Sequence, residues 1–350
     1  MNNYFCVLPF FSVETSIENT DKNIYCCRLS PDSDINKVRN DIKDKKRSKS
    51  CSTCWALEDA GLPSERQIHN RTLDFLLDLN LENIEKKSLS DGFNPLQIKL
   101  TTSNLCNGQC VTCNSELSSS WAMLEGKPTK YTKINHDLLD FGINWSNIVS
   151  LSFVGGEPLL EKQNFKILKN LIDLNNTNCF ISIVTNGSIS LTNKQFEILK
   201  QFPNLNICLS IDGTSKSFEY LRYPLKWDKL LENLKIFKSI TKNISVSCMI
   251  SNCNIYFYSD LINFFREQNL NYLMKQIINP FIFNPSNLKQ KAKDIILEKN
   301  KEHHNEIHGF LYMNKFNEQL YENFLLELER QDNLKKIKLK DYCPELINLL

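Results

Sequence analysis

The chain has 350 residues, of which 41% are hydrophobic and 23% are charged, an ordinary composition for a folded globular protein. The 42 Lys and Arg residues nearly balance the 40 Asp and Glu residues, so the net charge of +2 gives no reason to expect a nucleic acid or an anionic membrane as partner. No apolar run is long enough to span a bilayer, and the first residues lack a basic leader with a long apolar core. We therefore expect a cytoplasmic protein with no nucleic-acid or membrane partner.

Thirteen cysteines are the unusual part of this composition. In the cytoplasm, glutathione and thioredoxin keep thiols reduced, so these cysteines are expected to be metal ligands or small buried hydrophobic residues rather than disulfides.

A first group of cysteines lies near the start of the chain. Cys6 opens the stretch CVLPFFSVE, Cys26 and Cys27 are adjacent, and Cys51 and Cys54 form CSTC. One cysteine of the adjacent pair together with the other three makes four potential ligands, which is enough to close a zinc site or to hold an iron-sulfur cluster. The C-x2-C spacing alone does not distinguish these metals, and plain structural thiols remain a third interpretation.

The middle of the chain alternates short apolar strands with amphipathic helical segments. Residues 164–174, 193–202, 227–240 and 260–268 place apolar side chains three and four apart, as in a helix that packs one face on a sheet. Repeated strand and helix units predict a parallel sheet, either open or closed into a full or partial barrel, with ligands at the carboxyl ends of the strands. The strand candidates are residues 96–100, 148–155, 180–185, 205–211, 244–250 and 272–278.

A second cysteine group directly follows the first of these strands. Cys106, Cys110 and Cys113 stand in SNLCNGQCVTCNSE, with three and then two residues between them. Three thiolates suit a four-iron cluster in which one iron stays free to bind another molecule. The alternatives are a structural zinc site that uses a distant fourth ligand, or three buried thiols.

The next three strand candidates are also followed by polar or glycine-rich loops. These loops contain Gly155-Gly156-Glu157-Pro158, then Asn186 with its neighbours, and then Ser210 with Asp212. Such residues also punctuate ordinary strand-to-helix loops, because they tolerate tight turns. Four successive loops in one parallel sheet nevertheless indicate a common site.

The cysteine triplet after the first strand and GGEP after the second together resemble the radical S-adenosylmethionine (SAM) enzymes over roughly residues 95 to 280. This resemblance implies a partial six-stranded (β/α) barrel with a [4Fe-4S] cluster on the three cysteines. SAM would bind the free iron and be cleaved reductively to a 5′-deoxyadenosyl radical, which removes a substrate hydrogen.

The resemblance also implies a role for each loop. Gly155 and Gly156 would allow close backbone approach to the methionine part of SAM, and Glu157 would accept from its ammonium group. The remaining candidates would meet the ribose hydroxyls or the carboxylate, with the alternative for Arg222 being a solvated surface arginine. These candidates are Asn186, Ser210, Asp212 and Arg222.

The first cysteine group has a resemblance of its own. C-x-L-P-F, the adjacent cysteines and C-x2-C-W-x2-E-x2-G-x2-S-x-R resemble the twitch or SPASM-like auxiliary-cluster module of radical SAM enzymes. This resemblance implies a second, auxiliary [4Fe-4S] cluster on Cys6, Cys26, Cys51 and Cys54, with Cys27 as the alternate to Cys26.

The sequence therefore predicts an α/β protein with three parts. Residues 1–90 would form the small α+β auxiliary-cluster module, residues 91–285 the radical SAM barrel, and residues 286–350 a helical extension. The expected activity is oxidation or crosslinking of a peptide or protein side chain, fed by a low-potential donor such as flavodoxin or ferredoxin. The alternatives are a dehydrogenase acting on a small sugar or cyclitol, and a non-catalytic iron-sulfur or zinc scaffold.

Overall fold

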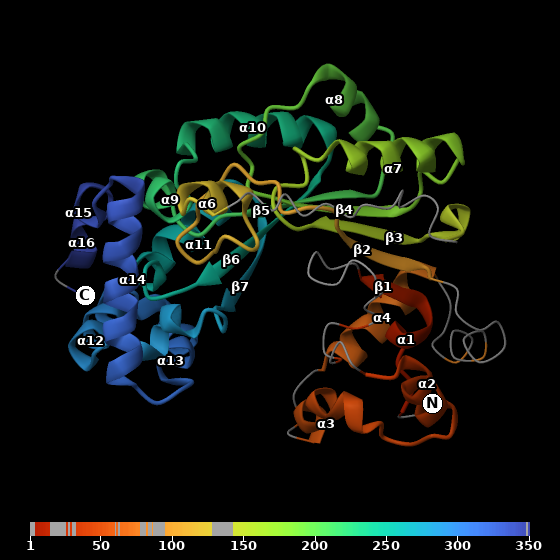
Figure 1. Cartoon of the computed structure of the whole chain (residues 1–350), viewed down its shortest axis with the longest axis horizontal. Helices are drawn as coiled ribbons and strands as arrows, with labels where there is room; N and C mark the ends of the chain where they lie inside the picture. Colours follow the sequence, from red (N-terminus) through yellow and green to blue (C-terminus); the bar gives the residue numbers. More distant parts are fainter. Residues whose placement is uncertain are drawn as a thin grey trace. The chain divides into compact units, whose positions relative to one another are not determined.

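The computed structural model of the chain describes residues 4–14, 26, 29, 33–59, 61, 64–77, 82, 86, 95–127, 143–347 and 349–350. Its strands form one parallel sheet in which they follow one another in chain order (Figure 1). The α/β class and the helical C-terminus predicted from the sequence are confirmed. The strands are β1 (Ser12–Glu14), β2 (Gln97–Thr101), β3 (Ser150–Val154), β4 (Phe180–Thr185), β5 (Leu205–Ser210), β6 (Asn243–Ile250) and β7 (Asn271–Gln276).

Strands β2 to β7 are the six strands that the sequence predicts, with small differences at their ends. Strand β1 is an addition, and it pairs in parallel with β2, with Ser12 opposite Gln97. A strand of three residues is too short to show the alternation of apolar and polar side chains by which strands are recognised.

The chain divides into two compact units, of which the first contains residues 1–103, 132–183 and 193–205. Strands β1 to β4 belong to it, and Gln97, Ser150 and Phe180 stand at the same level of the parallel ladder. The helices of this unit are α1 (Leu8–Phe11), α2 (Ile35–Lys43), α3 (Ser52–Asp59), α4 (Glu65–Leu77), α7 (Lys162–Asp173) and α8 (Asn193–Leu199), with the short 3-10 turns Lys49–Cys51 and Trp145–Asn147.

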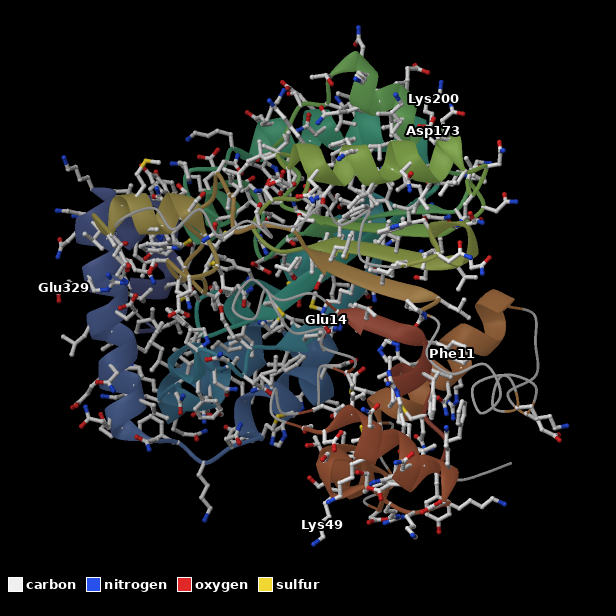
Figure 2. All side chains as sticks on the ribbon, turned by 45° about the vertical axis from the view of Figure 1, so that its right-hand side comes forward. Phe11, Glu14, Lys49, Asp173, Lys200 and Glu329 are labelled. Atoms are coloured by element: carbon white, nitrogen blue, oxygen red, sulfur yellow. The ribbon has the colours of Figure 1, made fainter. Side chains whose placement is uncertain are left out.

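Helices α7 and α8 of the first unit lie side by side, as Figure 1 shows. Helix α7 begins where the Glu161 side chain accepts a hydrogen bond from the backbone N of Gln163, and it buries an apolar face that includes Ile167. Asp173 and Lys200 stand on the solvent side of this region (Figure 2). The amphipathic pattern in the sequence therefore places these helices correctly.

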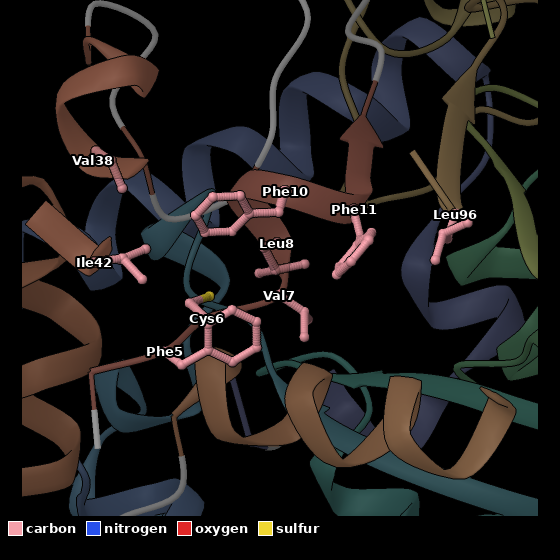
Figure 3. Packing of buried hydrophobic residues seen from close by; sticks show 9 residues of the cluster. All are labelled: Phe5, Cys6, Val7, Leu8, Phe10, Phe11, Val38, Ile42 and Leu96. Carbon is pink, nitrogen blue, oxygen red and sulfur yellow. The ribbon is translucent and has the colours of Figure 1, made fainter. Parts of the chain in front are cut away.

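A hydrophobic cluster holds the N-terminal segment of the first unit together (Figure 3). Cys26 and Cys51 pack against the border of this cluster. Aromatic and aliphatic side chains of this size each contribute roughly 1.5–3 kcal/mol when fully buried, so the segment is firmly anchored. The members are Phe5, Cys6, Val7, Leu8, Phe10, Phe11, Val38, Ile42 and Leu96.

The second unit contains residues 104–131, 184–192 and 206–350. Strands β5, β6 and β7 belong to it, with Ser210 opposite Ser247 and Met249 opposite Lys275. Its helices are α6 (Ser119–Leu124), α9 (Ser215–Leu221), α10 (Trp227–Ile240), α11 (Tyr258–Glu267), α12 (Gln290–Lys299), α13 (His304–Tyr312), α14 (Glu318–Lys335), α15 (Leu339–Tyr342) and α16 (Pro344–Ile347), with 3-10 turns at Ile255–Phe257, Phe281–Phe283, Pro285–Asn287 and Lys301–His303. Across the described residues, no helix combines the length and the apolar character needed to cross a membrane.

Candidate functional site

The loop that carries Cys106, Cys110 and Cys113 begins the second unit. Its fold is fixed by local hydrogen bonds: the backbone N of Cys106 donates to Ser119 Oγ over 3.0 Å, and Ser118 Oγ donates to the carbonyl of Gly108 over 2.7 Å. All three cysteines are partly exposed. The loop therefore holds its three partly exposed thiols in a hydrogen-bonded turn.

Glycine at position 108 leaves room between two of the sulfur atoms. A Cβ at Gly108 would lie 3.4 Å from the Sγ of Cys110 and 3.7 Å from the Sγ of Cys106. A methyl group at this position would just contact both sulfurs, and a longer side chain would fill more of the space beside them. The missing side chain thus keeps a cradle open between two candidate ligands.

The electrostatics of the triplet are those of crowded, partly desolvated thiols. Burial, with a smaller contribution from the neighbouring Cys110, raises the pKa of Cys113 to about 12. Burial also raises the pKa of Cys110, while the guanidinium of Arg222 opposes that rise. Thiolate is the form that binds metal, so binding at this loop would release protons.

An ion pair lies directly beside Cys110. Arg222 ends α9 and its Nη2 is 2.6 Å from Asp212 Oδ2, while its Nη1 lies 4.0 Å from the Sγ of Cys110. The other oxygen of Asp212 accepts from the backbone N of Met249 over 2.8 Å, and its carbonyl accepts from Asn254 Nδ2. Both charged side chains are almost fully buried. Arg222 is therefore not the solvated surface arginine that the sequence left as an alternative.

The pair leaves one donor of Arg222 open. Its Nε is buried, and among the described residues no acceptor pairs with it. A buried unpaired donor costs free energy unless a ligand or water satisfies it. Asp212 raises the pKa of Arg222 against the lowering effect of burial, so the guanidinium stays charged beside the cysteine loop.

Asn186, in the loop after β4, is also joined to the cysteine loop. Its Nδ2 donates to Asn107 Oδ1 over 2.8 Å, and Asn107 Nδ2 donates to Ser188 Oγ over 2.8 Å. Ser188 Oγ closes the ring by donating to Asn186 Oδ1 over 2.7 Å. Ser210, at the end of β5, is partly buried. Within the second unit, contacts thus connect Asn186, Asp212 and Arg222 to the triplet.

The GGEP loop lies in the first unit and packs against the end of β2. Gly155 has a φ of +116°, and a Cβ there would lie 2.8 Å from the carbonyl oxygen of Ser103. The backbone N of Gly156 donates to the same oxygen over 3.1 Å, and Glu157 accepts from Leu159 N over 3.1 Å while 1% exposed. Close packing within the chain therefore already requires glycine at position 155.

The four predicted auxiliary-cluster cysteines line one cavity of the first unit. Cys6, Cys26, Cys51 and Cys54 surround it, and its empty space is about 340 Å³ with the part open to solvent included. Burial raises the pKa of Cys6 to about 12 and that of Cys51 to about 11. Cys27 lies outside the described residues. Leu8, Pro9, Leu29 and Arg66 complete the lining.

The residues that follow CSTC form a network beside this cavity. Arg66 Nε donates to Glu58 Oε1 over 3.0 Å, and Arg66 Nη1 donates to the carbonyl of Phe5 over 2.7 Å. Ser64 Oγ donates to the same carboxylate, and the guanidinium of Arg66 stacks 4.6 Å from the ring centre of Trp55. The motif W-x2-E-x2-G-x2-S-x-R thus forms one ion-pair and stacking unit that borders the cysteine cavity.

Neither cysteine group is arranged around a single ion. Among the residues that the structure describes, no three His, Cys, Asp or Glu side chains come together so that they could hold one metal ion. What the structure does bring together is two sulfurs around Gly108 in one group, and four cysteines around one cavity in the other.

Sequence reasoning missed several residues of these sites. The sequence patterns do not single out Asn107, Ser188, Trp121, Gln331 or Lys335, and they include Arg66 only as one letter of a motif. The position of Asn107 inside the cysteine motif was an available signal. The others are brought to the site by tertiary packing, which no local pattern in the sequence reveals.

The fold and the site define a class of protein: a parallel α/β sheet with a three-thiol loop after β2 and a buried Arg–Asp pair beside it. Residues 100–252 match the model of the Radical SAM superfamily. This stretch, which is less than half of the chain, is therefore similar to radical SAM domains.

Two curated proteins are similar to parts of the chain. An uncharacterized protein of Methanocaldococcus jannaschii is 26% identical over 181 residues, which is 50% of this chain and 59% of that protein. The 7-carboxy-7-deazaguanine synthase of Clostridium acetobutylicum is 26% identical over 197 residues, which is 52% of this chain and 85% of the enzyme. The chain thus spans less than two thirds of the length of the first of these relatives.

Two solved structures resemble the fold more loosely. Native anSMEcpe with bound AdoMet has a TM-score of 0.44 at 17% identity, covering 62% of each chain. Streptococcus suis SuiB bound to S-adenosylmethionine has a TM-score of 0.43 at 18% identity, covering 70% of this chain and 58% of that one. Because both TM-scores are below 0.5, these structures carry no argument about the family of this chain.

A radical SAM domain implies a [4Fe-4S] cluster and SAM, and the residues present fit both groups. Three thiols with an open cradle at Gly108 are the donors such a cluster takes. The buried, unpaired Nε of Arg222 offers a charged donor for an anionic group such as the SAM carboxylate.

Proposed function

We propose that this protein is a radical SAM enzyme that abstracts a hydrogen atom from a peptide or protein side chain and thereby oxidises or crosslinks it. The observation that carries the first half of this proposal is the environment of Cys110. A candidate ligand of a three-cysteine set lies 4.0 Å from a buried guanidinium that keeps one donor free. When bound, the cluster and SAM supply the electron and the 5′-deoxyadenosyl radical for the reaction.

The chain's own residues hold and orient these groups. Cys106, Cys110 and Cys113 bind the cluster, and the glycine at 108 keeps the space between their sulfurs clear. Arg222 binds the SAM carboxylate through its free donor, while Asp212 fixes the orientation of the guanidinium.

The other predicted contacts complete the SAM site in this proposal. Gly155 and Gly156 allow the close approach of the methionine part, and Glu157 accepts from the ammonium group. Ser210 and Asp212 meet the ribose hydroxyls or the carboxylate end of SAM, with Asn186 nearby. Because Asn186 is already bonded to Asn107 and Ser188, its remaining capacity would be directed by that ring.

SAM cleavage tests the first half of the proposal. Anaerobically reconstituted protein with a low-potential reductant and SAM should release 5′-deoxyadenosine, measured by liquid chromatography with mass spectrometry. Cys106→Ala should abolish the release, whereas Cys179→Ala, which changes a buried cysteine of another part of the fold, should retain it. No release from wild-type protein that carries its full complement of iron would refute the enzyme and leave the scaffold interpretation.

We propose further that Cys6, Cys26, Cys51 and Cys54 hold an auxiliary [4Fe-4S] cluster. Four thiols on one cavity support this, and Arg66 would offset part of the negative charge of a bound cluster. A cluster with four protein ligands has no iron free for substrate, so it would carry electrons or stabilise the fold. Cys27 stays the alternate to Cys26.

Metal analysis tests the auxiliary cluster separately. Reconstituted wild-type protein should contain about eight irons and eight sulfides, and Cys51→Ala with Cys54→Ala should lower both to about four. Retention of the whole iron content in this double variant would contradict the proposal, and binding of zinc instead of iron by the native protein would replace it.

The proposal of a peptide substrate rests on the likeness of the N-terminal motif to auxiliary-cluster modules. The name of the Clostridium relative points instead to a small molecule, so the substrate class needs a direct test. Peptide pools with deuterated side chains and pools of deuterated sugars and cyclitols should be compared. Deuterium in 5′-deoxyadenosine from the peptide pool alone supports the proposal, whereas transfer from the sugar pool alone would establish the alternative.

The remaining features of the proposal follow from this chemistry. Reduced thiols and a low-potential donor such as flavodoxin or ferredoxin place the enzyme in the cytoplasm. The division into an auxiliary-cluster module (1–90), a radical SAM barrel (91–285) and a helical extension (286–350) is retained as part of the proposal.

A further inference from the structure

Helix α14 presents a buried polar pair. Gln331 is 1% exposed and Lys335 is 5% exposed, and the two positions are four apart, so they lie on the same face of the helix. Glu329 lies on the solvent side of the same helix (Figure 2). Burying an amide and an ammonium on a helix is costly unless both are engaged, so their partners are informative.

The partner of Gln331 is the cysteine loop. Its Nε2 donates over 2.9 Å to the carbonyl of Val111, which stands between Cys110 and Cys113. On its other side, the backbone N of Val111 donates to the carbonyl of Leu221 over 2.8 Å. The backbone between two candidate cluster ligands is therefore held from both sides, at the end of α9 and by α14.

Lys335 reaches the same loop through Trp121. Its Nζ lies 4.7 Å from the centre of the Trp121 ring, and Trp121 Nε1 donates to the carbonyl of Cys110 over 2.9 Å. Lys335 Nζ also donates to Gln331 Oε1 over 2.9 Å, which closes the circuit. In the described part of the chain, no carboxylate lies within ion-pair distance of this ammonium.

The ammonium is electrostatically coupled to the cysteine loop. Burial lowers the pKa of Lys335 to about 8, and the neighbouring Cys110 and Asp332 oppose that lowering. A bound cluster is an anion, and in a partly desolvated site a nearby cation stabilises the more negative, reduced form.

We propose that Gln331 and Lys335 are positioning residues of the radical SAM cluster: Gln331 fixes the loop between Cys110 and Cys113, and Lys335 makes the cluster easier to reduce. This inference rests on the proposed function, since it needs a cluster on these cysteines. It gives the C-terminal extension a part in the chemistry of the domain.

Two pairs of variants test the two roles. Lys335→Met removes the charge and is compared with Lys338→Met, which changes an exposed lysine shortly after α14. Gln331→Leu removes the donor and is compared with Gln319→Leu, at an exposed position of the same helix. Lys335→Gln removes the charge while keeping a donor for Gln331, and it serves if the Met variant does not fold.

The effect of the Lys335 charge is measured as the midpoint potential of the cluster in a redox titration. The cluster is identified as the one whose paramagnetic signal responds to SAM. A unit charge at roughly 10 Å in a medium of effective dielectric constant 20 changes an equilibrium by about tenfold. We therefore expect the ratio of reduced to oxidised cluster at a fixed potential to fall about tenfold in Lys335→Met, equal to about 59 mV for one electron. An unchanged midpoint in a variant with full iron content would overturn the role of Lys335.

The contact between Gln331 and the cysteine loop is tested on metal-free protein. In the reduced, metal-free protein, alkylation of Cys110 and Cys113 by iodoacetamide should become several-fold faster in Gln331→Leu and stay unchanged in Gln319→Leu. Equal rates would overturn the role of Gln331. Alkylation can be measured even if the wild-type protein binds no cluster. Absence of a cluster would refute the proposed function and the role of Lys335, whereas the alkylation rates would still test the contact of Gln331 with the loop.

Discussion

The buried pair of Arg222 and Asp212 allows the sharpest prediction from the structure. Arg222→Met removes the guanidinium and leaves the carboxylate of Asp212 buried, with the backbone N of Met249 as its remaining donor among these contacts. Breaking one side of a buried ion pair typically costs about 3–5 kcal/mol because the remaining charge is uncompensated. The free energy of unfolding should fall by about this amount.

A double variant distinguishes the cost of an unpaired buried carboxylate from the cost of losing the whole ion pair. Arg222→Met with Asp212→Asn removes both charges and keeps an acceptor for Met249 N, so it should recover all but about 1–2 kcal/mol of the loss. Urea unfolding of the metal-free protein gives these values, provided that the slope of the transition stays constant. Arg266→Met, at an exposed arginine, is the control and should change stability by less than about 0.5 kcal/mol.

SAM binding gives an independent readout of the same variants. Both the single and the double variant lack the guanidinium, so both should lose SAM affinity even though the double variant is stable. A double variant that is as unstable as Arg222→Met would refute the coupling of the two side chains. Full SAM affinity in either variant would refute the role of Arg222.

Three further predictions follow from the contacts. Gly155→Ala should destabilise the protein by about 1–3 kcal/mol, because the new Cβ would lie 2.8 Å from the carbonyl oxygen of Ser103. Gly126→Ala, at a φ of +64° in open space, is the control and should show only the backbone cost of about 1 kcal/mol. Equal losses of the two variants in thermal unfolding would refute the clash. Arg66→Met should cost about 3–5 kcal/mol in denaturant titration, because it leaves the carboxylate of Glu58 buried without its partner. Arg47→Met, whose partner Asp59 is exposed and which stacks on the same Trp55, should change stability far less, and equal losses would refute the buried role of Arg66. In a double-mutant cycle, Asn107→Ala and Asn186→Ala should be coupled by about 0.5–1.5 kcal/mol, and strictly additive effects would show that their hydrogen bond adds nothing.

The sequence predicts those features of the fold that depend on local pattern. Alternating apolar residues locate β2 to β7, and apolar residues three and four apart locate α7, α8, α10 and α11. Strand β1 is not predicted, because three residues are too few to show an alternation of apolar and polar side chains. A parallel sheet also fixes the edge at which the loops after its strands gather, and this is why the sequence predicts that Asn186, Asp212 and the cysteine triplet lie near one another.

Contacts between side chains far apart in the sequence are what the pattern does not contain. Asp212 was expected to face SAM directly, and its carboxylate is instead engaged by Arg222 and Met249 N. Gln331 lies 220 residues from Val111, and nothing in the composition of α14 marks that partnership. Cys343 is fully buried and interacts electrostatically with Cys253, 90 residues earlier in the chain.

The account depends most on SAM binding at a cluster held by Cys106, Cys110 and Cys113. The direct measurement is electron paramagnetic resonance of the reduced cluster, recorded with and without SAM in a Cys51→Ala and Cys54→Ala background that removes the auxiliary site. The account predicts a cluster signal that changes on addition of SAM and disappears when Cys110→Ala is added. A signal that SAM leaves unchanged, or one that survives Cys110→Ala, would contradict it.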